Sequence, residues 1–245
     1  MARGLCPPRG SGPWQVGDNS LCYEAIGDPQ AEHTVVLIMG LGLQMAWWRD
    51  DFCAELAGRG LRIVRFDNRD VGHSTRILGP GVSAFGFLRR RATATYSLGD
   101  MADDTAGLIE QVAPEGAHVV GVSLGSLIAQ EVAIRHAART VRIAIRRSMS
   151  RGPGDDSGRQ LAAILNERDR RADLGRLQMP ALVIHGDQDR IMQPSGGRAT
   201  AAAIPGSELL EITGMGHDLA RWTWRAVIDG IERTARRAGS PRMNP

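Results

Sequence analysis

One short motif limits what this chain can fold into more than any other feature. It reads Gly121-Val122-Ser123-Leu124-Gly125, and it lies between an apolar run with β-branched residues and a segment with helical character. A serine between a strand and a helix, with glycine two residues before and after it, is typical of a nucleophile elbow. Larger side chains at Gly121 and Gly125 would collide with neighbouring backbone. The motif predicts that Ser123 projects from the turn in a strained conformation.

Apolar runs alternate with helical patterns along the rest of the chain. Continuous apolar strands separated by helices are typical of parallel strands that are covered on both faces. The sequence therefore predicts a doubly wound, mostly parallel α/β sheet of roughly seven or eight strands. Strands are expected over residues 20–26, 34–39, 61–66, 117–122, 140–145, 181–185 and 208–212, and helices over 45–59, 98–112, 124–138, 157–171, 195–203 and 219–238.

Length and composition indicate one domain. The chain has 245 residues, of which 42% are hydrophobic, so we expect a loose arm over residues 1–18 and one domain over 19–245. No apolar stretch reaches the roughly 18 residues of a membrane span, and we expect no secretory signal. Cys6, Cys22 and Cys53 are scattered and lack the spacing of a metal site. They predict reduced thiols in a cytoplasmic protein.

The charge of the chain is weakly basic. The formal net charge is +3, and all 30 basic residues are arginine. The arginines are spread along the chain, with runs at residues 89–91 and 146–147 among them, and they form no recognition-helix pattern. This distribution lacks the features of a nucleic-acid interface, so we expect no nucleic-acid partner.

A nucleophilic serine needs a general base. In this architecture the catalytic groups follow the chain order serine, acid, histidine. Four of the six histidines come before Ser123, on its strand or on the helix after it, and His185 precedes the best acid candidate. Only His217 has the right order, and glycines on both sides of Met215 let its loop bend back over the serine. We therefore predict that His217 is the general base.

The base in turn needs an acid to orient it. Asp187 and Asp189 directly follow the apolar run 181–185, at the strand end where such a sheet places its active site. We predict Asp189 as the acid, because the loop has room to turn its carboxylate toward the histidine. Asp187 is interpreted as a turn residue. Asp155 or Asp156 is the alternative acid.

Hydrolysis of an acyl group also needs two N–H groups that stabilise an oxyanion. The backbone N–H of Leu124 follows the serine at the start of a helix, where the dipole favours negative charge. The second N–H is expected from Leu41, because Gly40 and Gly42 allow a close backbone approach. We expect no cofactor and no metal in this site.

Together, the serine motif, Gly186-Asp187-Gln188-Asp189 and Gly214-Met215-Gly216-His217 resemble those of α/β-hydrolases, and the resemblance covers residues 20–238. Met39-Gly40-Leu41-Gly42 and the segment 67–74, Asp-Asn-Arg-Asp-Val-Gly-His-Ser, resemble a group of serine carboxylesterases that includes aclacinomycin methylesterase-like proteins.

Two positions depart from the usual forms of these motifs. The first motif usually reads His-Gly where this chain has Met39-Gly40, and the second usually has glycine where this chain has Asp70. The resemblance places Asp67 and His73 in a supporting loop beside the elbow.

The resemblance also implies a helical cap between the strands at 140–145 and 181–185. This chain leaves little room for one, so residues 146–176 are interpreted as a reduced cap segment and the site as an open cleft. A missing cap exposes apolar surface, which makes a homodimer plausible. The expected rim of the cleft consists of Met45, Trp47, Trp48, Phe85 and Phe87.

The resemblance implies a serine carboxylesterase that hydrolyses small or short-acyl esters through an acyl-enzyme. Dehalogenases and epoxide hydrolases of this fold need Asp in place of Ser123. Two alternatives remain open. The same catalytic groups can hydrolyse enol-lactones or carbon–carbon bonds, or carry out perhydrolysis. A non-catalytic ligand-binding protein is the other alternative, and a broken triad or oxyanion loop is its expected signature.

Overall fold

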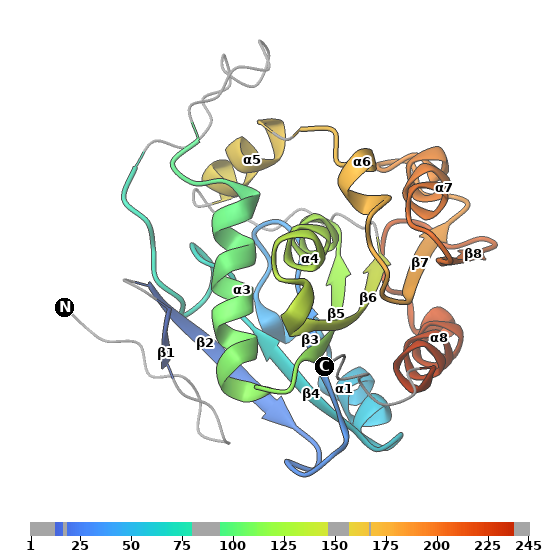
Figure 1. Cartoon of the computed structure of the whole chain (residues 1–245), viewed down its shortest axis with the longest axis horizontal. Coiled ribbons are helices and arrows are strands. Elements are labelled where there is room, and N and C mark those ends of the chain that lie inside the picture. The colour runs from blue at the N-terminus through green and yellow to red at the C-terminus, as the bar shows by residue number, and fades with distance from the viewer. Residues whose placement is uncertain (1–12, 17–18, 80–93, 147–156, 167, 238–245) are drawn as a thin grey trace.

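An eight-stranded sheet runs through the part of the chain that the computed structural model describes, residues 13–16, 19–79, 94–146, 157–166 and 168–237 (Figure 1). The spatial order of the strands is β1-β2-β4-β3-β5-β6-β7-β8. In chain order they are β1 (Pro13–Val16), β2 (Asn19–Ile26), β3 (His33–Ile38), β4 (Leu61–Phe66), β5 (Ala117–Val122), β6 (Thr140–Arg146), β7 (Ala181–Gly186) and β8 (Glu208–Ile212).

Six of these strands are parallel. β3 lies between β4 and β5, so that Val36 has Val64 on one side and Val119 on the other. β6, β7 and β8 continue in parallel, whereas β1 and β2 pair antiparallel at the other end of the sheet. The mostly parallel sheet predicted from the sequence is therefore confirmed. Its carboxyl ends meet at one edge, which brings together the loops after β3, β5, β7 and β8.

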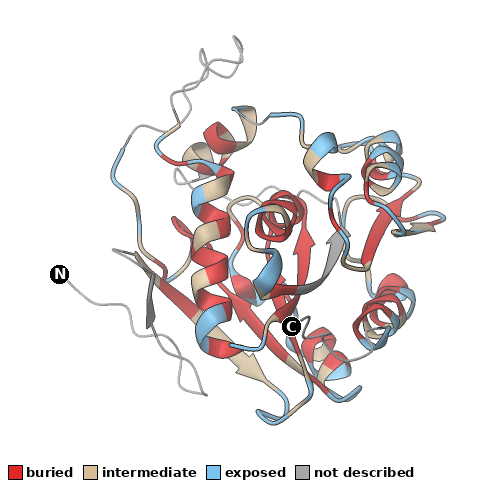
Figure 2. Cartoon of the chain, viewed as in Figure 1, coloured by how far each residue is buried: buried red, intermediate tan, exposed pale blue. Residues whose placement is uncertain are grey.

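Helices cover both faces of the sheet (Figure 1). On one face α3 and α4 pack against Val36 and Val64, and on the other α1 and α8 pack against Val35 and Ile63. Neighbouring residues of a strand thus bury side chains in opposite layers. Figure 2 shows that the central strands, which lie between the helices, are buried. The α-helices are α1 (Asp50–Ala57), α3 (Leu98–Val112), α4 (Leu124–Arg135), α5 (Ser157–Leu165), α6 (Arg171–Leu174), α7 (Pro194–Ala203) and α8 (Trp224–Arg236).

The helix expected over residues 45–59 is interrupted. A 3-10 turn, η1 (Met45–Trp47), precedes α1, and the backbone between them is extended at Arg49. Two contacts hold the break. The buried Arg65 donates to the carbonyl of Trp48, and the Trp48 indole stacks on Phe52 with ring centroids 5.7 Å apart.

Two other expected helices are shorter than the sequence pattern suggested. The helix expected over 157–171 ends at Leu165, and the short α6 follows. The helix expected over 219–238 begins as a 3-10 turn, η3 (Arg221–Thr223), before α8. Each pattern located its helix correctly but placed a boundary several residues away.

The N-terminal segment and the cysteines differ from expectation. Within the arm expected over 1–18, residues 13–16 form β1, which pairs with the exposed edge of β2. The expectation of three reduced thiols is wrong for Cys22, which is disulfide-bonded. Pro13 lies opposite Cys22, so residues 13–16 run alongside this strand. Cys53 is a free thiol, and burial raises its pKa to about 12, which keeps it protonated at neutral pH.

None of the helices within the described ranges combines the length and the apolarity that crossing a bilayer takes.

Replacing Gly125 by alanine tests the packing of α4 on β3. A Cβ at this position would lie 2.2 Å from the carbonyl oxygen of Ile38, so the helix would have to move. We expect Gly125→Ala to lower the free energy of unfolding by about 2 kcal/mol or more, and the melting temperature by roughly 4–8 °C.

Gly175→Ala is the matched control, because its Cβ would approach the Ala172 carbonyl only to 3.4 Å. Its melting temperature should stay close to that of the wild type. Equal melting temperatures for the two variants would contradict this packing argument.

Candidate active site

Ser123 occupies a sharp turn between β5 and α4. Its φ of 56° lies in the left-handed region, and the residue is only 4% exposed. Both the backbone N–H and the hydroxyl of Ser126 donate to the Ser123 carbonyl, at 2.9 and 2.6 Å. A Cβ on Gly121 would lie 2.1 Å from the carbonyl oxygen of Gly125. The strained backbone and the need for glycine on both sides are those that the sequence motif predicts.

The loop after β3 lies directly against the serine. A Cβ on Gly40 would lie 3.2 Å from the Ser123 Cβ and 3.8 Å from its hydroxyl oxygen. The loop then turns tightly, because the N–H of Leu43 donates to the carbonyl of Gly40 at 3.2 Å and Gly42 has a φ of 66°. Leu41 is therefore on a loop that touches the serine.

Leu124, the other predicted donor of an N–H group, is the first residue of α4 and directly follows Ser123. The first N–H groups of a helix have no intrahelical acceptor, and the helix dipole favours an anion there.

Asp189 and His217 form a close pair. The Asp189 Oδ2 lies 2.7 Å from the Nδ1 of His217, and the carboxylate has no solvent-exposed surface. Its other oxygen accepts the backbone N–H groups of Ile191 and Met192, both at 2.9 Å. The carboxylate is thus fixed by its own loop and aims one oxygen at the imidazole.

Asp187 has a different environment. Its Oδ1 accepts the N–H of Gly214 at 2.7 Å, and the N–H of Gln188 donates to the Met215 carbonyl at 3.0 Å. A Cβ on Gly186 would lie 2.0 Å from that same carbonyl. Asp187 therefore ties the loop after β7 to the loop after β8, in the way expected of a turn residue. Asp155 and Asp156, the alternative acids, lie outside the described residues.

The sequence did not single out His185 as part of this site. Its buried Nε2 lies 2.9 Å from the carbonyl of Met192 and 3.6 Å from the Oδ2 of Asp189. Because the carbonyl can only accept, this nitrogen carries the proton. The ring thereby holds the loop that presents Asp189. The signal that could have revealed it is its position at the end of a strand, four residues before the acid.

Asp67 supports the loop after β3, and His73 contributes its backbone N–H to the Asp67 carboxylate. The Asp67 carboxylate accepts the N–H of Met45 at 2.7 Å and the N–H of His73 at 3.1 Å. Burial raises the pKa of Asp67, and these two hydrogen bonds oppose that rise. The side chain of Asn68 donates to the Met39 carbonyl at 3.2 Å. These bonds brace the backbone on both sides of the loop that touches the serine.

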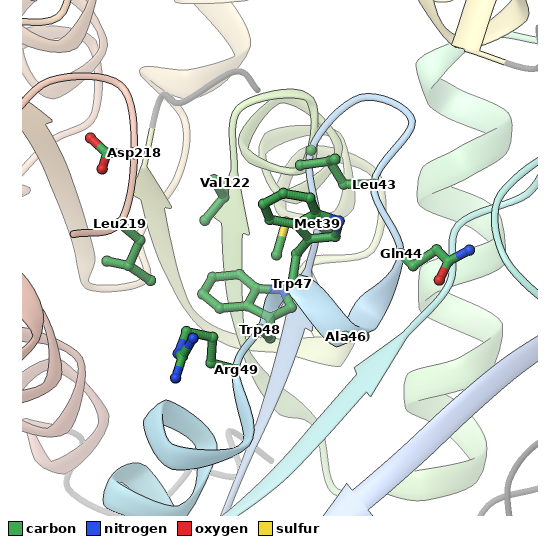
Figure 3. Close-up of a pocket in the computed structure, with 11 residues that line it drawn as sticks. Met39, Leu43, Gln44, Ala46, Trp47, Trp48, Arg49, Val122, Asp218 and Leu219 are labelled. Carbon is green, nitrogen blue, oxygen red and sulfur yellow. The ribbon is translucent and has the colours of Figure 1, made fainter. Parts of the chain in front are cut away.

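A cavity of about 470 Å³ lies next to the elbow (Figure 3). Figure 3 shows Trp47 and Trp48 near the centre of the lining residues, with Leu219 and Asp218 on the opposite side from Leu43. Trp47 is 58% exposed, whereas Trp48 is almost fully buried. The wall of the cavity is mostly apolar. The lining residues include Met39, Gly40, Leu43, Trp47, Val122 and Leu219.

The expected rim is only partly correct. Trp47 and Trp48 line the cavity, but Met45 is buried and does not. Phe85 and Phe87 lie outside the described residues. Within the described ranges no group of three or more His, Cys, Asp or Glu side chains is placed to hold a metal ion.

Comparison with known proteins identifies the family. The profile of the alpha/beta hydrolase fold family matches residues 33–153 and 146–220. This chain belongs to the α/β-hydrolase fold family.

Several known proteins are similar in sequence over part of the chain. Rhodomycin D methylesterase DauP of Streptomyces sp. (strain C5) is 35% identical over 115 residues, which cover 47% of this chain and 34% of DauP. The putative carbamate hydrolase RutD of Caulobacter segnis is 32% identical over 134 residues, 54% of this chain and 45% of RutD. The matches thus span less than half the length of these relatives.

Solved structures are similar over nearly the whole chain. A hydrolase from Pseudomonas aeruginosa superposes with a TM-score of 0.75 at 20% identity, covering 91% of this chain and 97% of the other. The enol-lactonase of Burkholderia xenovorans has a TM-score of 0.72 at 20% identity and covers 89% of this chain and 97% of its own. At this identity the comparison establishes the fold.

The short contact between Asp189 and His217 predicts a measurable proton signal. A proton on Nδ1 that is hydrogen-bonded to a buried carboxylate should resonate well downfield of the amide protons in the NMR spectrum. Asp189→Asn should abolish this signal, because the amide NH₂ group would face Nδ1 while its oxygen still accepts from Ile191 and Met192.

Asp187→Asn is the matched control and should keep the signal. A downfield proton that both substitutions leave in place, or that both remove, would contradict the pairing of Asp189 with His217.

Proposed function

We propose that this protein is a serine carboxylesterase that hydrolyses small or short-acyl esters through an acyl-enzyme. The observation that carries the proposal is the arrangement at the carboxyl edge of the sheet. Ser123 stands on a strained elbow beside the Gly40 loop, and His217 lies 2.7 Å from a buried carboxylate on the neighbouring loops. These are the parts that nucleophilic acyl transfer requires.

In the proposed mechanism the Ser123 hydroxyl attacks the ester carbonyl carbon while the Nε2 of His217 takes its proton. Asp189 holds the imidazole in the tautomer whose Nε2 carries no proton and can accept one, and it stabilises the imidazolium that forms. The N–H groups of Leu41 and Leu124 stabilise the negative oxygen of the tetrahedral intermediate. His217 then returns the proton to the leaving alcohol, and the acyl group stays on Ser123.

Water completes the cycle. It attacks the acyl carbon as His217 accepts one of its protons, a second tetrahedral intermediate forms at the same N–H groups, and the serine leaves with that proton. The products are a carboxylic acid, an alcohol and free enzyme. No cofactor or metal takes part in either half of this mechanism.

The names of the relatives support ester or related acyl substrates. DauP is a methylesterase and RutD a putative carbamate hydrolase, and both reactions cleave a bond between a carbonyl carbon and a heteroatom. The apolar cavity beside Gly40 and Val122 supports an uncharged organic group next to the reacting carbonyl. We propose a small-molecule ester as the natural substrate.

Replacing Ser123 by alanine tests the nucleophile. The wild type should hydrolyse p-nitrophenyl acetate and butyrate and should be labelled by a serine-reactive fluorophosphonate. Ser123→Ala should lose both the label and at least about 10³-fold in kcat/KM, with an unchanged melting temperature.

Each other result has a distinct meaning. Near wild-type activity in Ser123→Ala would contradict the assignment of Ser123 as the nucleophile. A wild type that is labelled but hydrolyses none of the esters would favour another reaction with the same catalytic groups. A wild type without label or turnover would favour a ligand-binding protein.

A second pair of substitutions tests the acid. Asp189→Asn should lower kcat by roughly 10³- to 10⁴-fold, because the imidazole would be held in the wrong tautomer. Asp187→Asn keeps an oxygen for the N–H of Gly214 and should cost less than about tenfold, or about 1.4 kcal/mol. Steady-state kinetics on p-nitrophenyl butyrate measure both, and the opposite ranking would assign the role to Asp187.

A further inference from the structure

The side chain of Gln160 connects α5 to the loop that touches the serine. It is completely buried, and its Oε1 accepts the N–H of Gly42 at 2.8 Å. Its Nε2 donates to the carbonyl of Arg69 at 2.9 Å. The oxygen and the nitrogen of this buried amide are hydrogen-bonded to backbone groups of two separate loops, so the side chain fixes those loops relative to each other.

The bond to Gly42 acts next to the N–H group of Leu41. The carbonyl of Gly40 belongs to the same peptide plane as that N–H, and it is held because it accepts from Leu43 at 3.2 Å. The following peptide plane carries the N–H of Gly42, which Gln160 holds. The two planes meet at the Cα of Leu41. Together the two hydrogen bonds set the direction of the Leu41 N–H.

An ion pair with a buried carboxylate secures the helix that carries Gln160. The guanidinium of Arg159 makes two hydrogen bonds to the Asp70 carboxylate, at 2.9 and 3.0 Å. The carboxylate has no exposed surface, and it also accepts from the hydroxyl of Tyr96 and the N–H of Ile77, both at 2.7 Å. α5 is thus attached to the segment next to Arg69 through two consecutive residues, Arg159 and Gln160.

The backbone conformation of Asp70 indicates that its side chain has a specific role in this ion pair. Asp70 has a φ of 69°, a region that favours glycine, and it stands where the related motif usually has glycine. Asp70 and Ser123 are the non-glycine residues with positive φ in the described part of the chain. A side chain kept in such a conformation indicates a specific use for it, and here that use is the bond to Arg159.

We infer that α5 is a positioning element for the oxyanion loop, with Gln160 as the positioning residue and the Asp70–Arg159 pair as its anchor. The inference rests on the proposed esterase function. Figure 1 shows α5 at the carboxyl end of the strands, the side on which the loop after β3 lies. Although the segment expected as a cap is short, its described helix holds the loop that stabilises the transition state.

Gln160→Met tests the inference, because methionine is similar in size and removes both hydrogen bonds. We expect kcat for p-nitrophenyl butyrate to fall roughly 10- to 100-fold, with KM changed less than about twofold, because the loop acts in the transition state. A trifluoromethyl ketone, which adds to the serine and places an oxyanion in the same site, should bind more weakly by the same factor as kcat/KM falls.

Gln130→Met is the matched control. Gln130 lies on α4 and is also buried, and its side-chain oxygen accepts from Arg170 at 3.3 Å. It should lower the melting temperature without changing kcat or the affinity for the ketone. A folded Gln160→Met protein with wild-type kcat would overturn the inference, and so would equal losses of kcat in the two variants.

A double variant, Asp70→Gly with Arg159→Met, covers the case in which Gln160→Met does not fold. It removes both charges together, restores glycine at the positive φ and leaves Gln160 in place. We expect a folded protein with a lowered kcat and a weakened ketone affinity, and wild-type values for both would overturn the role of the anchor.

The wild type separates this inference from the proposed function. A wild type that neither hydrolyses the esters nor takes up the phosphonate label would contradict the proposed function and, with it, the inference. An active wild type with unaffected variants would contradict the inference alone.

Discussion

The candidate site depends on close contacts between backbone segments that leave no space for side chains. A Cβ would lie 2.1 Å from a carbonyl oxygen at Gly121, 2.2 Å at Gly125 and 2.0 Å at Gly186. The first two contacts hold the elbow against itself and against the end of β3, and the third holds the acid loop against the histidine loop. Because any side chain there would push these segments apart, the three glycines allow the elbow to lie against the end of β3 and the loop after β7 to lie against the loop after β8.

Hydrogen bonds between the loops then fix the groups that the contacts bring together. The loop that carries Asp189 is held by Asp187 at Gly214 and by His185 at the carbonyl of Met192. The carboxylate of Asp189 has its own N–H partners besides His217. In the proposed esterase, groups that are fixed by such bonds need little rearrangement in the transition state, which makes electrostatic stabilisation effective.

The sequence revealed the parts of this structure that depend on local patterns. Apolar runs located the strands from β2 to β8, because a parallel strand covered on both faces is apolar along its whole length. The glycine motif gave the elbow, and chain order gave the proximity of Asp189 and His217. The fold class was therefore predictable, and so was the pairing of these two side chains.

What the sequence did not reveal depends on contacts between distant segments. The helix expected over 45–59 breaks because Arg65, from the next strand, bonds to the carbonyl of Trp48. The role of Gln160 depends on Gly42 and Arg69, which are 118 and 91 residues away. In this region the sequence contained one signal, which was Asp70 at a motif position that is usually glycine. The ion pair of Asp70 with Arg159 gives this departure a physical reason. An aspartate at positive φ costs roughly 1–2 kcal/mol relative to glycine, and four hydrogen bonds to its buried carboxylate offset that cost. Strain at Asp70 and strain at Ser123 thus belong to one arrangement, in which the first helps to secure the loop beside the second.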